Sequence, residues 1–343
     1  MHQFQVDSQV RTRIAILRFT MIFGIVILHT PAYVSITDIG SGWFDLTKAF
    51  LQSAVFRCTV PVLTCLSGYL LFGSGIDRNI HKLVRKKFHT LALPFFACNV
   101  LLAALLYLLQ SQFTVPISYQ LYPFSLDRML DAAFGYSKHP VNYPLNFLRD
   151  LLVLMVLAPF IGYLLRNAAV LGLALVIALF WLDFDGILVL RNEMAILFYI
   201  GGMAAVQKWN ITRLDNYAGA CLVAFLALCA YIVLFKVANT TYLRFLAPFL
   251  LWPTTVLLVN TRVGDWLAAR AEHSFFIFLL HAPVLVLSYA LYQEMEESIP
   301  YALYWFAAPV LTTWGLIVAH RFCTASRLPG FGRDFSAGKS KTT

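Results

Sequence analysis

The chain has 343 residues, of which 60% are hydrophobic and 13% charged, and its formal net charge is +9. A soluble domain has about 45–50% apolar and about 25% charged residues, so much of this surface must face lipid. The basic residues are spread among short segments between apolar runs, which argues against a nucleic-acid-binding patch. The six cysteines form no CxxC pair, so we expect neither a metal site nor a disulfide.

Long apolar runs predict an all-α bundle of membrane-spanning helices, since about 20 apolar residues cross a bilayer as a helix. The fifth and sixth are the least regular, because Asp183 and Asp185 enter the end of the fifth and the sixth is short. The first run is too long for a signal-peptide core and lacks a small-residue cleavage site, so we expect it to be retained. We predict ten helices, at residues 13–34, 50–73, 91–110, 146–165, 168–188, 192–207, 216–236, 242–260, 273–293 and 301–321.

The charges between these runs predict the orientation of the helices. Basic residues concentrate in every second connecting segment, whereas the segments between them carry mainly Asp and Glu. Basic segments face the cytoplasm, so the pattern predicts that both termini are cytoplasmic. We therefore expect one integral membrane domain over residues 1–325 and a polar, disordered tail over residues 326–343.

The longest predicted loop, residues 111–145, falls on the outer side and is rich in proline and tyrosine, including Tyr143. Long loops in compact proteins are often functional. The alternative is an ordinary aromatic belt at the membrane interface. The sequence favours neither over the other.

Two ionisable residues lie within the first predicted helix. Arg18 and His29 are eleven residues apart, which is about three helical turns and about 16 Å along the axis. They therefore share one face of the helix. An Arg18 that extends to the interface and a hydrogen-bonded core His29 would be a purely structural explanation. Because ionisable groups in a membrane usually face a cavity or the bundle interior, the shared face favours a functional site.

Further basic residues lie in and beside the second predicted helix. Arg57 sits inside an apolar run, so it needs either an anionic ligand or a structural partner such as Asp150 or Glu193. The loop that follows holds a compact basic patch, which would attract anionic lipids or bind a phosphorylated soluble ligand. The patch consists of Lys82, Arg85, Lys86 and Lys87.

Three charged or titratable residues in the later helices complete the set. Arg149 and Asp150 are adjacent in sequence, so we expect their side chains to point in different directions and each to have another partner near the outer interface. An internal salt bridge is the structural alternative for each. His281 lies near the middle of its helix, and we expect it to make a structural hydrogen bond.

These residues, in this order, resemble the acyltransferase family 3 membrane proteins. An Arg, ten residues and a His in the first helix are the hallmark of that family, and Arg18 and His29 match it. RCTVPVLTCLSGYLL resembles the second helix of the family, and KLVRKKFHTLALPFF resembles its basic loop. NFLRDLLVLMVLAPF and SFFIFLLHAPVL resemble two later segments, so the similarity covers the whole chain.

The resemblance implies a bacterial cytoplasmic (inner) membrane enzyme that transfers an acyl group, most often acetyl. The donor would be cytoplasmic acyl-CoA, a co-substrate, and the acceptor a sugar hydroxyl of a polysaccharide or glycolipid at the outer face. By this likeness His29 is catalytic, and Arg18, Arg57 and the basic patch hold the CoA. We expect the acceptor side and the support of the site to involve Tyr143, Arg149, Asp150 and Glu193.

Two other functions compete with this one. A transporter or flippase of a glycan or small molecule would also place Arg and His within the membrane, although the sequence shows no inverted repeat or paired broken helices. A non-catalytic scaffold of polysaccharide assembly would leave the shared face of Arg18 and His29 without a role.

Overall fold

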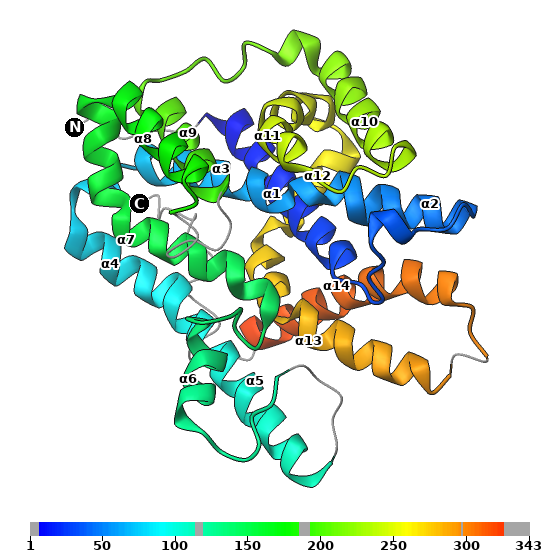
Figure 1. Cartoon of the computed structure of the whole chain (residues 1–343). Helices are drawn as coiled ribbons and strands as arrows, with labels where there is room; N and C mark the ends of the chain where they lie inside the picture. The colour runs from blue at the N-terminus through cyan, green and yellow to red at the C-terminus, as the bar shows by residue number, and fades with distance from the viewer. Residues whose placement is uncertain (1–6, 114–118, 185–192, 296–297, 326–343) are drawn as a thin grey trace.

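Helices make up the described part of the chain. The computed structural model describes residues 7–113, 119–184, 193–295 and 298–325, and the predicted tail at 326–343 lies outside them. Within these ranges there is no strand (Figure 1), which confirms the all-α prediction. The α-helices are α1 Ser8–Leu28, α2 Trp43–Ala49, α3 Thr59–Gly73, α4 Ile80–Lys87, α5 Leu93–Gln112, α6 Leu126–Phe134, α7 Asn146–Asn167, α8 Ala169–Trp181, α9 Glu193–Val206, α10 Ala218–Leu234, α11 Thr241–Thr254, α12 Arg262–Arg270, α13 Ser274–Gln293 and α14 Tyr301–Ala325.

Several of these helices join into membrane-length segments, so the protein is an integral membrane protein. The first, fifth and sixth predicted spans correspond to α1 and to the short apolar helices α8 and α9. The total of ten spans and the orientation of the termini stay predictions. Seven segments of the described residues are long and apolar enough to cross a bilayer: Trp43–Gly73, Ile80–Gln112, Tyr143–Asn167, Asp215–Leu234, Thr241–Leu258, Arg262–Gln293 and Tyr301–Ala325.

Polar contacts gather the connecting segments into two groups. At one end of the bundle, buried Arg13 pairs with Asp215 at 2.8 Å and donates to Thr255 at 2.7 Å. At the other end, Tyr301 contacts the loop after α1, and Lys236 donates to the carbonyl of Ile39 at 3.1 Å. The contacts of each group hold segments together that are far apart in the sequence.

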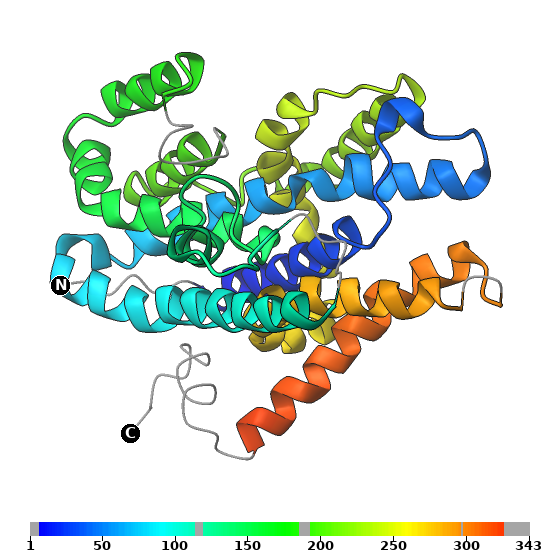
Figure 2. The same ribbon diagram turned by 60° about the horizontal axis from the view of Figure 1, so that its bottom comes forward.

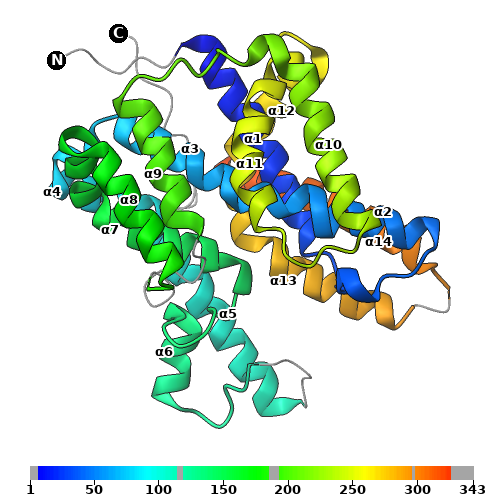
Figure 3. The same ribbon diagram turned by 45° about the horizontal axis from the view of Figure 1, so that its top comes forward.

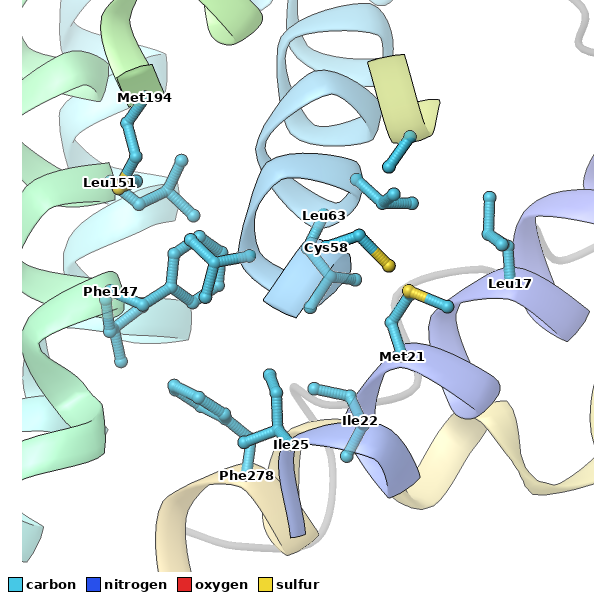
Figure 4. Packing of buried hydrophobic residues seen from close by; sticks show 14 of the residues in the cluster. Leu17, Met21, Ile22, Ile25, Cys58, Leu63, Phe147, Leu151, Met194 and Phe278 are labelled. Atoms are coloured by element: carbon cyan, nitrogen blue, oxygen red, sulfur yellow. The ribbon is translucent and has the colours of Figure 1, made fainter. Parts of the chain in front are cut away.

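The first helix forms part of the centre of the bundle. It packs against η3 (Val55–Cys58), α3, α12 and α13, and Figure 4 shows its apolar side chains around Met21, Ile25, Cys58 and Phe278. The turned view of Figure 2 shows α1 between α3 on one side and α13 on the other. Such a central helix has a restricted position, so the residues at its two ends are fixed relative to the rest of the bundle.

Close glycine contacts join α3 to α9. A Cβ on Gly68 would lie 2.1 Å from the Phe198 carbonyl oxygen, and a Cβ on Gly201 would lie 2.0 Å from that of Cys65. Glycine therefore allows these two backbones to approach each other more closely than any larger residue would.

The predicted outer loop contains a helix and projects from the bundle. Within residues 111–145, α6 packs beside the end of α5, and both extend away from the other helices (Figures 1 and 3). Ser137 donates two hydrogen bonds of 2.8 Å to Asp131 on α6. Burial acts to raise the pKa of Asp131, but these hydrogen bonds outweigh it and hold that pKa below its ordinary value. Residues 119–145, with the end of α5, thus have a small core of their own.

The basic patch is also helical, which corrects the predicted loop at these residues. Asn79 caps α4 by accepting from the Lys82 backbone N–H at 2.9 Å, and α4 continues into α5 through one wider turn, η5 (Phe88–Ala92). Only Leu83 of α4 is buried. A helix this short and polar lacks the long apolar run on which the predicted spans rest, so the sequence analysis missed it.

Candidate functional site

The site begins at the end of α1, where His29 follows the last helical residue. His29 is half-buried, and its backbone N–H still donates to Ile25 at 3.1 Å. The chain beyond it is tied down from two directions. Gln52 donates to the carbonyls of Ile27 and Thr30, both at 2.9 Å. Buried Lys48 and the hydroxyl of Tyr301 contact the next residues of the loop. The imidazole is therefore held at a fixed place.

His29 contacts a second histidine, His281 on α13. The distance from His29 Nδ1 to His281 Nε2 is 3.1 Å, and His281 is fully buried. The other nitrogen of His281, Nδ1, lies 2.8 Å from the Phe278 carbonyl oxygen. A carbonyl only accepts hydrogen bonds, so Nδ1 of His281 carries the proton and its Nε2 accepts. When both rings are neutral, His29 must then donate from Nδ1, which leaves its Nε2 unprotonated.

An aromatic side chain, that of Tyr143, also contacts His29. The ring of Tyr143 lies edge-on to His29 with 5.1 Å between centroids, and His139 lies 6.4 Å from Tyr143. Both residues belong to the projecting outer segment. The neighbouring residue Asn142 is buried and donates to the Leu279 carbonyl at 2.9 Å, which anchors this segment to α13. The aromatic outer segment therefore reaches directly to His29.

The expectation that Arg149 and Asp150 point apart is wrong. Their side chains form an ion pair, with Nε and Nη2 of Arg149 at 3.0 and 2.5 Å from Oδ1 of Asp150. The long Arg149 side chain folds back over its neighbour. The rule that only residues three or four apart face each other on a helix does not allow for a side chain this long and flexible. Arg149 also donates to the carbonyl of Gly135. The pair thus fastens the outer segment to α7 and lies beside, not in, the contact around His29.

The structural partners suggested for Arg57 are also wrong. Asp150 pairs with Arg149, and Glu193 pairs with Arg244 on α11 at 2.8 Å. Arg57 instead donates to the hydroxyl of Tyr33 and lies over its ring, 5.2 Å from the centroid. Within the described ranges it has no ion pair. Since Tyr33 follows His29 by four residues, Arg57 belongs to the same end of α1 as His29.

The middle of α1 faces the basic patch. Arg18 is exposed and lies within electrostatic range of Lys87. The positive charges of Arg18 and Lys86 both repel that of Lys87. In the part of the chain that the structure describes, neither Arg18 nor a side chain of the patch forms an ion pair. Such a concentration of unneutralised charge attracts a polyanion. The structure therefore places Arg18 near the basic patch, whereas Arg57, which was also predicted to hold CoA, lies at the C-terminal end of α1.

An apolar cavity of about 210 Å³ lies between α3, α9 and α11. Leu17, Tyr69 and Trp252 line it, whereas His29, His281 and Tyr143 do not. The cavity is therefore not part of the contact between His29 and His281.

Comparison with known proteins identifies the family. Residues 11–321 match the model of acyltransferase family 3, described as an acyltransferase domain. The chain belongs to this family. It is also similar to the succinoglycan biosynthesis protein ExoH of Rhizobium meliloti (strain 1021), with 30% identity over 332 residues that cover 92% of this chain and 89% of that protein. No solved structure matches the chain.

Within this acyltransferase domain, the sequence analysis missed the side chains that hold His29. Gln52, Lys48 and Tyr301 carry no motif that distinguishes them from other polar residues near helix ends. His281 was expected to make a structural hydrogen bond. It does bond to its own helix backbone, but it also contacts His29. The presence of a second histidine within an apolar run was the one available signal for this contact.

Proposed function

We propose that this acyltransferase-family protein is a membrane O-acyltransferase that moves an acyl group from acyl-CoA to a sugar hydroxyl. The acceptor would be a polysaccharide or glycolipid at the outer face of the bacterial inner membrane, and the donor would approach from the cytoplasm. The similarity to a protein named for succinoglycan biosynthesis supports a glycan acceptor. Acetyl is the acyl group that the family resemblance favours.

The observation that carries this proposal is the contact between His29 and His281. It fixes the tautomer of His29 so that Nε2 has the lone pair that either a base or a nucleophile requires. A half-buried position leaves the ring within reach of a substrate. The aromatic residues Tyr143 and His139 beside it suit the apolar face of a sugar ring.

In direct transfer, His29 acts as a general base. Its Nε2 takes the proton of the acceptor hydroxyl while the hydroxyl oxygen attacks the thioester carbonyl. The new C–O bond forms, the C–S bond breaks, and the thiolate of CoA receives the proton from the imidazolium. His281 accepts from Nδ1 throughout and so holds the ring in place.

In the alternative route, His29 Nε2 attacks the thioester itself. The C–S bond breaks, CoA departs as its thiolate, and an acyl-histidine that keeps its Nδ1 proton forms. The acceptor hydroxyl oxygen then attacks this acyl group, the C–N bond breaks, the thiolate of CoA takes the hydroxyl proton, and the neutral imidazole is restored. Both routes need the same unprotonated nitrogen, so the contact with His281 supports either.

The charges of Arg18 and the basic patch support acyl-CoA as the donor. CoA carries several phosphate charges, which Lys82, Arg85, Lys86 and Lys87 could neutralise together with Arg18. α1 then connects the phosphate end of the donor to His29, about 16 Å along the helix.

Purified protein in nanodiscs tests the proposal. We expect His29→Ala to bind acetyl-CoA with unchanged affinity and to lose about 10²–10⁴-fold in the rate of acyl transfer, the usual contribution of a general base. His320→Gln is the matched control, because His320 forms a second buried histidine pair, 2.7 Å from His273, away from His29. Transfer by His29→Ala at the wild-type rate would contradict the role of His29. A wild-type protein without affinity for acyl-CoA would contradict the enzyme and favour a glycan transporter.

A further inference from the structure

The residues around Arg57 form a second charged cluster on the His29 side of the bundle. Arg57 lies in η3, which packs against both α1 and α11. Arg244 on α11 lies within electrostatic range of Arg57, and the two positive charges oppose each other. The carboxylate in the cluster is that of Glu193, and it pairs with Arg244. Glu193 therefore neutralises Arg244, and the charge of Arg57 leaves the cluster with a net positive charge.

The guanidinium of Arg57 faces an accessible place. Its hydroxyl partner, Tyr33, is 57% exposed. Arg57 itself is only half-buried, and the side chain of Arg244 is 30% exposed. A tyrosine ring and hydroxyl satisfy only part of the guanidinium, which has five N–H donors. A charged group at membrane depth without a carboxylate partner marks a functional site by default.

The cluster is coupled to the loop that carries His29. Tyr33 follows His29 by four residues, and Gln52, five residues before Arg57, donates to the carbonyls of Ile27 and Thr30. The side chain of Phe56 packs on Gly24 of α1. These contacts fix Arg57 relative to His29. An anionic group held by Arg57 would therefore belong to the same substrate molecule that reacts at His29.

We infer that Arg57, with Tyr33 and Arg244, binds a carboxylate of the substrate. The planar guanidinium forms paired hydrogen bonds with a carboxylate, and the unneutralised charge of the cluster favours its entry. The carboxylate belongs either to a dicarboxylic acyl group on the donor or to an acidic sugar of the acceptor. This inference rests on the proposed function, because both sources are substrates of that reaction.

Binding measurements with wild type, Arg57→Gln and Tyr33→Phe separate the two sources. The first arm compares succinyl-CoA with acetyl-CoA, and the second compares a glucuronate-containing oligosaccharide with a neutral glucose oligosaccharide of equal length. We expect wild type to prefer the acidic member of one arm, and Arg57→Gln to lose about tenfold or more of its affinity for that member alone, as for a lost charge-assisted hydrogen bond. Tyr33→Phe should lose less.

Arg128→Gln is the matched control, since Arg128 is an exposed arginine of the outer segment and donates to backbone carbonyls of that segment. It should leave both arms unchanged. A preference in the first arm assigns the carboxylate to the acyl group, and one in the second assigns it to the acceptor. The inference is overturned if wild type prefers no acidic ligand, or if Arg57→Gln weakens acidic and neutral ligands equally. Failure of the proposed function is distinct, since wild type would then bind neither CoA ester while the second arm still tests Arg57.

Discussion

The hydrogen bond between His29 and His281 determines which nitrogen of His29 is available for chemistry. His281 is itself fixed, because its Nδ1–H donates to the carbonyl of Phe278. Without an acceptor at His281, the neutral imidazole of His29 could move its proton to Nε2 and lose its basic lone pair at the reacting position. His281 is therefore a positioning residue.

Substitution of His281 tests this role. We expect His281→Leu to lower kcat by about 10²-fold, the lower range for general base catalysis, while KM for acyl-CoA stays unchanged. His281→Gln should recover part of the lost kcat, since its amide oxygen can accept from His29 Nδ1–H. Steady-state kinetics of both variants measure the effect. A merely structural role would instead give equal losses in the two variants, or a change in KM.

Residue identities alone left these contacts undetermined. The sequence places Arg18 and His29 on one helix face because helical spacing is regular. The partner of each buried charge depends on which helices are neighbours, and that information is absent from local spacing. Glu193 and Arg244 are 51 residues apart, and their contact follows only from the packing of α9 beside α11.

At the scale of the helices, the contact between α3 and α9 depends on glycine residues. Gly201→Ala would put a Cβ 2.0 Å from a backbone oxygen of α3, so one helix must shift. We expect a loss of about 1–3 kcal/mol in stability, as for overpacked cores, and a lower melting temperature in detergent. Gly219→Ala is the control, because a Cβ there meets nothing within 4 Å. Equal melting temperatures for the two variants would show that α3 and α9 do not pack this closely.

Helices were the part of the fold that hydropathy predicted well. Each predicted span overlaps a helix, since a bilayer requires a long apolar run whatever the neighbouring helices are. The described α-helices that no predicted span covers are short ones, α2, α4, α6 and α12. Those that bear on the site are α4 and α6. Their positions matter for the site, because α4 carries the basic patch and α6 supports the segment that ends at Tyr143.

At the scale of the whole molecule, the proposed function places donor and acceptor at different levels along α1. Arg18, at the middle of α1, faces the basic patch, whereas His29, Tyr143 and Arg57 lie at its C-terminal end. A carrier of several phosphate charges would not cross the bilayer freely, because burying a charge in hydrocarbon is costly. Acyl-CoA should therefore act from one side only, the side of the basic patch.

Oriented proteoliposomes test this division. An impermeant maleimide that labels Lys82→Cys reports vesicles with the basic patch outside, and one that labels Tyr122→Cys reports the opposite orientation. Wild-type labelling gives the background of the native cysteines. With the glycan acceptor enclosed, we expect external acyl-CoA to support transfer in proportion to the fraction in which Lys82→Cys is labelled. Transfer that follows the Tyr122→Cys fraction would contradict the division, because the phosphates of the donor would then reach the protein from the His29 side, where Arg57 and Arg244 would have to bind them.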